Sequence, residues 1–226
     1  MKKLTVLMMC LLLGLCSLDA ADKPFGVFAN NNTNSIQFID PETNETTGPL
    51  LGGQLGSYGG GLFDVVITPD GKTAVVSNFG DSKVFFIDIS GGFNAAPKLL
   101  KTCKIPFFAE DMAICCGRWL LITDGGFSNW ILVYDIFTGK WRVYHLFNKY
   151  ANAVSCINFN GICLVVVADY FSRALHIFKL DCSTGILVFL KTIKIPPFCP
   201  VNVTISPDGR TGIAVIAGYS ACVDGA

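Results

Sequence analysis

The sequence is poor in the side chains that most enzymes use for chemistry. Its 226 residues include only two histidines, His145 and His176, and no Gly-x-Ser-x-Gly motif that would place a serine nucleophile beside one of them. His176 stands in the apolar stretch Leu175-His-Ile-Phe178, which is typical of a strand histidine bonded by its neighbours. Histidine-based catalysis therefore has no support in the sequence, and we predict no catalytic residue.

An excess of charge of either sign is also lacking. The chain has 17 basic and 17 acidic residues, so nothing recruits it electrostatically to nucleic acid or to an anionic membrane. The one long apolar run, residues 4–18, is 15 residues long and falls short of the ~20 that span a bilayer. We predict no nucleic-acid partner and no membrane span.

Ten cysteines are many for this length, but they lack metal-binding spacing. No Cys-x-x-Cys pair occurs, which argues against zinc and thioredoxin-like chemistry, and we predict no metal or cofactor. Disulfides are open in an oxidising compartment, although connectivity cannot be read from sequence. Four cysteines stand in expected inner strands and are predicted to be small buried side chains: Cys115, Cys116, Cys156 and Cys163. Two stand in connecting segments and are predicted to be more exposed: Cys103 and Cys199.

The N-terminus has the layout of a secretory signal peptide, predicted to cover residues 1–20. Lys2 and Lys3 precede the apolar run, and cleavage is expected after Ala20. A lipoprotein anchored at Cys16 is the alternative, but the bulky Leu15 precedes that cysteine. Without the segment, 15 basic and 16 acidic residues remain. We predict a periplasmic or secreted protein.

Three sets of landmark residues recur with one period. Turn glycines recur at spacings of 46, 44 and 48 residues, small polar residues at 48, 46 and 45, and aspartates at 48, 47 and 46. The glycines are Gly71, Gly117, Gly161 and Gly209; the polar residues are Asn30, Asn78, Asp124 and Asp169; the aspartates are Asp40, Asp88, Asp135 and Asp181.

A period near 46 residues with short strands predicts the blades of an all-β propeller. Helical repeats are excluded, because no window has apolar residues at i, i+3, i+4 and i+7. Each blade is expected to be a four-stranded antiparallel sheet. The predicted domain covers residues 21–226, with blades at roughly 25–60, 61–105, 106–150, 151–197 and an incomplete 198–226.

Several motifs resemble those of one repeat family. Thr68-Pro-Asp-Gly-Lys72 and Ser206-Pro-Asp-Gly-Arg210 look like the turn of YVTN-type β-propeller repeats and of the lactonase-like seven-bladed propellers. Val75-Val-Ser-Asn78, followed by Val84-Phe-Phe-Ile-Asp88, resembles the strand pair of the same repeats. The resemblance implies a propeller and permits a lactonase activity.

The sequence holds fewer blades than that family has. The 205 residues from Asp22 to Ala226, divided by a period near 46, give between four and five blades where the resemblance implies seven. We therefore expect a truncated product or fragment that forms an open arc. Its unpaired blade edges are expected near residues 26–29 and 211–217, where self-association through strand pairing is predicted.

One set of polar residues repeats at the start of the expected first strand of each blade. First strands line the central channel of a propeller, so their starting residues converge on one concave mouth. We predict that this set binds a ligand at the mouth; the alternative is that it bonds loop backbone or the neighbouring blade. The residues are Asp64, Asp111, Asn152 and Asn202.

Two classes of function remain. The first is a non-catalytic scaffold that binds a protein or small-molecule partner, and it is favoured. The second, implied by the resemblance, is a lactonase-like hydrolase of sugar lactones such as the 6-phosphogluconolactonase-like proteins. A hydrolase needs a general base, and the mouth offers only Asp64, Glu110 and Asp111.

Overall fold

The structure is a computed structural model that describes residues 24–57, 61–126, 129–146, 150–159 and 162–217. The predicted signal peptide lies outside these residues. Every regular element among them is a β-strand, and none of them belongs to a helix that could span a membrane. The chain forms two compact units, Met1–Phe108 and Ala109–Ala226, which are described separately.

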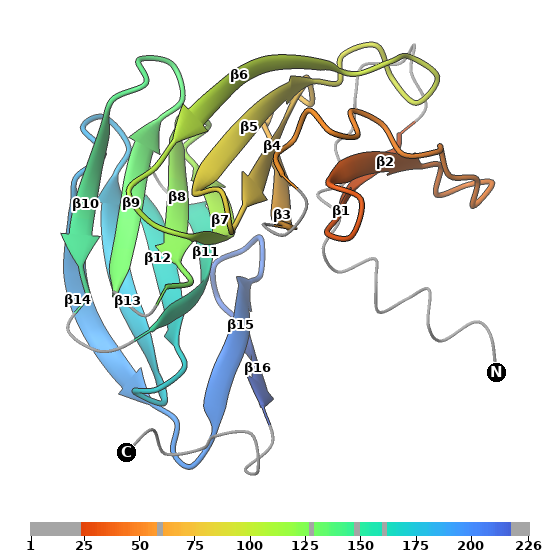
Figure 1. Ribbon diagram of the computed structural model, residues 1–226. Helices are drawn as coiled ribbons and strands as arrows, with labels where there is room; N and C mark the ends of the chain where they lie inside the picture. The colour runs from red at the N-terminus through yellow and green to blue at the C-terminus, as the bar shows by residue number, and fades with distance from the viewer. Residues whose placement is uncertain (1–23, 58–60, 127–128, 147–149, 160–161, 218–226) are drawn as a thin grey trace, which may run out of the picture. The chain divides into compact units, whose positions relative to one another are not determined.

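Unit 1 contains a hairpin and a four-stranded sheet, both antiparallel (Figure 1). The apolar side chains of the hairpin pack with those of the sheet in one core that includes Val27, Phe38, Leu62 and Phe85. The hairpin is β1 (Gly26–Asn30) and β2 (Ser35–Ile39); the sheet is β3 (Leu62–Ile67), β4 (Thr73–Asn78), β5 (Lys83–Asp88) and β6 (Lys98–Lys104).

Unit 2 contains two four-stranded antiparallel sheets and a hairpin in series. The first strand of the middle sheet, β11, packs against the first strands of its neighbours, β7 and β15. The sheets are β7 (Ala109–Cys115), β8 (Trp119–Asp124), β9 (Trp130–Asp135) and β10 (Trp141–His145), then β11 (Ala151–Phe159), β12 (Ile162–Asp169), β13 (Ala174–Asp181) and β14 (Leu187–Lys194); the hairpin is β15 (Cys199–Ile205) and β16 (Gly212–Ala217).

The second strands of the two four-stranded sheets in unit 2 are the most deeply buried. All six residues of β8 are buried, and β12 is buried from Val165 to Asp169. Because these strands are covered on both faces, they are apolar without alternation, as a strand in a sheet buried on both faces must be. The predicted all-β architecture of four-stranded antiparallel sheets in series is confirmed.

The periodic landmarks have a common physical basis in turn chemistry. An aspartate directly follows β2 and ends each of β5, β9 and β13, and each carboxylate accepts the backbone N–H two residues further on. These are Asp40, Asp88, Asp135 and Asp181. This hydrogen bond defines the Asx turn, which only a short acidic or amide side chain can make. Gly71, Gly117 and Gly209 have φ values of 71°, 65° and 68°, which glycine adopts without steric cost.

The outer strands β1 and β16 each have one hydrogen-bonded partner strand in the described part of the chain. On β16 the apolar side chains of Ile213, Val215 and Ile216 are exposed. These are the two strands at which the sequence predicted unpaired blade edges.

Candidate functional site

The four predicted mouth residues lie at irregular points of the first strands. The register of β3, β7, β11 and β15 shifts near the start of each strand, which marks a β-bulge there. We call the ends where these strands begin the leading ends, and the opposite ends the trailing ends. All four residues are half-buried at the leading ends: Asp64 in unit 1, and Asp111, Asn152 and Asn202 in unit 2.

In unit 2, two of these side chains bond the next sheet. The Asp111 carboxylate in β7 accepts the backbone N–H of Val154 in β11 at 2.7 Å. The Asn152 amide in β11 donates to the carbonyl of Val201 in β15 at 2.6 Å. These bonds join three successive first strands. The alternative that the sequence left open, bonding to the neighbouring blade, describes what both side chains do.

The bulges are also supported from the second strands. The Asp64 backbone N–H donates to Ser77 Oγ at 2.9 Å, and the Asp111 backbone N–H donates to Thr123 Oγ1 at 3.1 Å. Sequence reasoning missed these hydroxyl residues. Their signal was available, because Ser77 and Thr123 each directly precede a periodic landmark, Asn78 or Asp124.

A buried acidic group lies beside Asp111 at the leading end of unit 2. The Glu110 side chain is 8% exposed and accepts a hydrogen bond from the Tyr150 hydroxyl at 3.3 Å. Burial, together with the nearby Asp124 carboxylate, raises the pKa of Glu110 to about 7. Burial likewise raises the pKa of Tyr150 above its usual range. Glu110, one of the three acids that the sequence offered as a general base, can therefore hold or release a proton near neutral pH.

Aromatic side chains gather at the leading ends of both units. In unit 2, Tyr150 makes edge-on contacts with Tyr170 and Phe171 at 6.3 and 5.5 Å between ring centroids. In unit 1, Phe79 contacts Phe63 at 5.3 Å and stacks on Phe108 at 5.0 Å. Phe63 is 53% exposed and Phe108 is 41% exposed. These rings were not among the site residues predicted from the sequence, although Phe79 and Tyr170 directly follow two of the small polar landmark residues, Asn78 and Asp169.

Both histidine side chains contact neighbouring side chains of the fold. His176 is buried in β13, where its Nδ1 lies 2.9 Å from Thr192 Oγ1 and its Nε2 lies 3.1 Å from the Asp169 carboxylate. The interpretation of His176 as a strand histidine bonded by its neighbours is confirmed. His145 ends β10 and contacts the ring of Trp130 edge-on at 5.1 Å.

The predictions for the cysteines were partly wrong. Four that were expected to be separate buried side chains or were left unassigned form two disulfides, Cys115–Cys156 and Cys116–Cys182. Cys199, expected to be exposed, is buried and disulfide-bonded. The bridged residues are 41 and 66 positions apart, and only the stacking of the two sheets brings them together.

Cys163 is a buried thiol, as predicted, and burial raises its pKa to about 12. Its sulfur and those of Cys115 and Cys156 lie within 4.8 Å of one another. Metal ions bind cysteine as the thiolate, so the Cys115–Cys156 disulfide removes two of these three ligands. This group could hold a metal only after reduction.

Similarity to known proteins is confined to structure. No protein-family model and no curated protein sequence matches the chain. The chain resembles hydrazine synthase of Kuenenia stuttgartiensis with a TM-score of 0.66 and 17% identity, over 89% of this chain and 54% of that one. It resembles a chain of a mitotic checkpoint complex with a TM-score of 0.65 and 15% identity, over 85% of this chain and 55% of that one.

The fold is that of a β-propeller. Both neighbouring structures have this fold, and at such low identity the likeness concerns the fold alone. This propeller chain spans about half the length of each of the two. The resemblance to YVTN-type and lactonase-like repeats stays a prediction from the turn and strand motifs.

Proposed function

We propose that this chain is a periplasmic or secreted β-propeller module that binds a protein partner through the aromatic side chains at the leading end of unit 2. β-Propellers serve many functions, so the fold narrows the function only to a scaffold or binding role. One of the structural neighbours belongs to a multiprotein complex, which agrees with such a role.

This proposal rests on a difference between the polar and the aromatic side chains at the leading end: the polar ones are hydrogen-bonded within the fold, and the aromatic ones are partly exposed. Asp111 and Asn152, which looked like ligand-binding residues, are engaged in bonds between sheets. The aromatic rings beside them are partly exposed, with Phe171 at 39%. Exposed aromatic groups dominate the energetics of protein interfaces, because large rigid rings bury much apolar area at low entropic cost.

Two observations support the location. The predicted signal peptide directs the chain out of the cytoplasm. The disulfides Cys115–Cys156 and Cys116–Cys182 form and persist in oxidising compartments, whereas cytosolic thiols are kept reduced. N-terminal sequencing of exported protein tests the location, with Ala21 expected as the first residue; a lipid on Cys16 would instead support the lipoprotein alternative.

A matched pair of variants tests the binding surface. Phe171→Ser removes a ring at the leading end of unit 2, whereas Phe137→Ser removes an even more exposed ring in the β9–β10 turn at the trailing end. The exported proteins are cross-linked and purified, and the attached proteins are quantified by mass spectrometry. We expect a partner that is retained by wild type and Phe137→Ser and reduced at least tenfold by Phe171→Ser. Equal recovery with both variants would contradict the proposal.

A hydrolysis assay on the wild type and two further variants tests the hydrolase alternative. Hydrolysis of gluconolactone above the spontaneous rate is measured for wild type, Asp64→Asn and Glu110→Gln. We expect no catalysed hydrolysis. A rate that wild type shows and either variant loses would assign a general base to the leading end and replace the binding-only function.

A further inference from the structure

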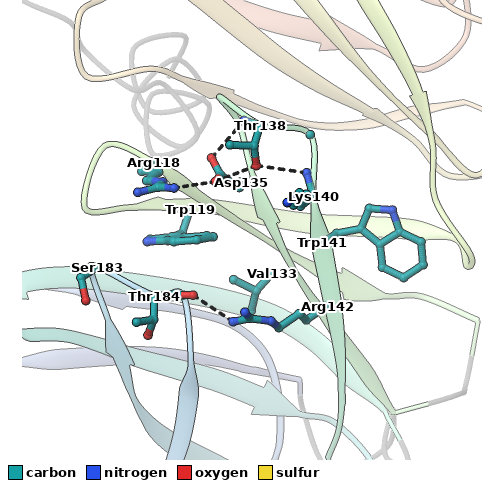
Figure 2. Close-up of a pocket in the computed structure, with 12 residues that line it drawn as sticks. Arg118, Trp119, Val133, Asp135, Thr138, Lys140, Trp141, Arg142, Ser183 and Thr184 are labelled. Carbon is teal, nitrogen blue, oxygen red and sulfur yellow. Dashed lines mark hydrogen bonds and ion pairs between the residues drawn. The ribbon is translucent and has the colours of Figure 1, made fainter.

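A pocket of about 520 Å³ opens at the trailing end of unit 2 (Figure 2). It lies where the β7–β8 turn, the β9–β10 hairpin and the β13–β14 turn meet. Its volume is in the range of small-molecule sites, roughly 300–1,000 Å³. Side chains central to its chemistry are Arg118, Trp119, Asp135, Thr138, Lys140 and Arg142.

Several bonds fix the β13–β14 turn against the β7–β10 sheet. The Cys116–Cys182 disulfide joins them covalently, and Trp119 Nε1 donates to the Cys182 carbonyl at 2.8 Å. Arg142 donates to the Thr184 carbonyl at 2.9 Å (Figure 2). The walls of the pocket are therefore held in place before any ligand arrives, which lowers the entropic cost of binding.

Close packing at Gly185 completes one wall. Gly185 has a φ of 69°, and a Cβ atom there would lie 2.6 Å from Cζ3 of Trp119. Only glycine fits this position, so the turn lies directly against the Trp119 ring. The Arg118 guanidinium lies over the same ring, 4.7 Å from its centre.

The pocket carries more positive than negative charge. Arg118 pairs with Asp135 at 2.8 Å, and this bond holds the pKa of Asp135 well below its usual range, so the pair is neutral as a whole. Lys140 and Arg142 have no carboxylate partner among the described residues. Asp181, the last residue of β13, accepts the backbone N–H groups of Ser183 and Thr184.

The strand geometry directs both unpaired cations to one side. Lys140 directly precedes β10 and Arg142 is its second residue; side chains two positions apart in an extended segment share a face, and both of these line the pocket. Trp141 between them also lines the pocket, and Figure 2 shows its ring apart from the other labelled side chains. The Nε atom of Arg118 is buried and has no hydrogen-bond partner in the described part of the chain. Unused donors and unpaired positive charge thus meet in one preformed pocket.

We propose that this pocket binds a small ligand that carries a phosphate or carboxylate group, with the oxyanion held by Lys140 and Arg142. Oxyanions suit these partners because charge-assisted N–H···O bonds are the strong ones and a guanidinium presents a fork of donors. The site is at the opposite end of unit 2 from the aromatic rings of the proposed protein-binding surface. It would give the module a second, chemically different ligand.

Calorimetry on the full chain tests this with defined probes. Phenyl phosphate and phenylacetate present the two oxyanions, inorganic phosphate lacks the ring, and benzyl alcohol lacks the charge. We expect phenyl phosphate to bind at least tenfold more tightly than benzyl alcohol, and the affinity to fall as sodium chloride is raised, because exposed charges are screened. The ratio of phenyl phosphate to phenylacetate affinity identifies the preferred oxyanion.

Charge-reversal variants locate the site. Lys140→Glu is expected to weaken phenyl phosphate binding at least tenfold, whereas Lys179→Glu, which changes the net charge equally at an exposed position of β13, should leave it within twofold of wild type. Lys140 is exposed, and near-ultraviolet circular dichroism checks that each variant is folded. Equal affinity of Lys140→Glu and wild type, or of phenyl phosphate and benzyl alcohol, would overturn the proposal. Lys140→Met, which removes the charge without reversing it, must fall between wild type and Lys140→Glu.

Discussion

The two ends of unit 2 join neighbouring sheets by different chemistry. At the leading ends, Asp111 and Asn152 reach across to backbone groups of the next first strand. At the trailing ends, the join is the Cys116–Cys182 disulfide together with side-chain donors that bind carbonyls of the next turn. One end is linked by polar side chains of the first strands, and the other by a covalent bond and a packed tryptophan.

This difference decides which polar groups stay available for a ligand. Two of the leading-end residues that resemble a binding site in sequence, Asp111 and Asn152, bond the neighbouring sheet. The trailing end is held by the disulfide and by Trp119, so Lys140 keeps a charge that no described carboxylate neutralises. A polar residue that recurs in every repeat can thus belong to the bonds between sheets, and a polar residue that does not recur can belong to a ligand-binding site.

Removing the trailing-end disulfide should have the largest effect on stability. Cys116 and Cys182 are 66 residues apart, and loop-closure entropy for such a separation predicts a loss of about 4 kcal/mol in the free energy of unfolding. The variant is Cys116→Ser with Cys182→Ser, followed in urea by tryptophan fluorescence. All three tryptophans, Trp119, Trp130 and Trp141, belong to unit 2, so the signal reports on that unit alone.

The control for the disulfide is Cys103→Ser, which lies in β6 of unit 1 and should leave the tryptophan transition unchanged. A double variant that loses less than about 1 kcal/mol would show that the leading-end bonds and the remaining Cys115–Cys156 disulfide suffice to hold the sheets, and the contrast between the two ends would fail.

The second largest effect concerns pH and the buried Glu110. Its pKa is raised from 4.5 to about 7 in the folded protein, so between these values the folded state keeps a proton that the unfolded state releases. The free energy of unfolding therefore falls as pH rises from about 4.5 to 7, by about 3 kcal/mol for a shift of this size. Glu110→Gln has no charge to bury and should abolish this fall.

Urea unfolding at pH 4.5 and pH 8, again by tryptophan fluorescence, measures the difference. The Gln variant should gain stability relative to wild type at pH 8 and gain none at pH 4.5. The opposite outcome is the same difference in unfolding free energy between wild type and variant at both pH values. It would mean that Glu110 ionises in the folded protein at little energetic cost, and that its surroundings are more polar than its burial indicates.

The smallest of the three effects is expected at the leading-end bond of Asp111. Asp111→Ala leaves the Val154 backbone N–H without its acceptor, and losing a charged hydrogen bond of this kind costs about 2 kcal/mol. Asp111→Asn keeps an acceptor oxygen and should recover at least half of the loss. Thermal unfolding of unit 2 provides the measurement, and an Ala variant as stable as wild type would mean that water replaces the carboxylate.

Much of the fold was readable because its signals are local. An Asx turn such as that of Asp135 and a positive φ such as that of Gly71 involve residues two to five positions apart, and their recurrence revealed the period. The strands between them followed from β-branched and aromatic runs, and the buried pattern of β8 and β12 from their continuous apolar character.

The candidate sites were less readable, because they depend on contacts between sheets. The ligand-binding role predicted for Asp111 stays a prediction, whereas its bond to Val154 spans 43 residues and could not be read from the repeat. The pocket combines Arg118 and Arg142 with Thr184, which approach only after two sheets have stacked. No periodic landmark falls on Lys140, so nothing in the repeat distinguishes it from a solvated surface lysine.

The adjacent positions of Cys115 and Cys116 have a consequence for biosynthesis. One bridges to Cys156 in β11 and the other to Cys182 after β13, so two vicinal thiols must choose between two partners. Four cysteines allow three pairings, and the wrong ones would lock the middle sheet in a false register with its neighbour. Correct folding therefore depends on conditions that let wrong disulfides be exchanged for right ones, and the yield of oxidative refolding without a thiol that allows this exchange would measure how often the chain pairs wrongly.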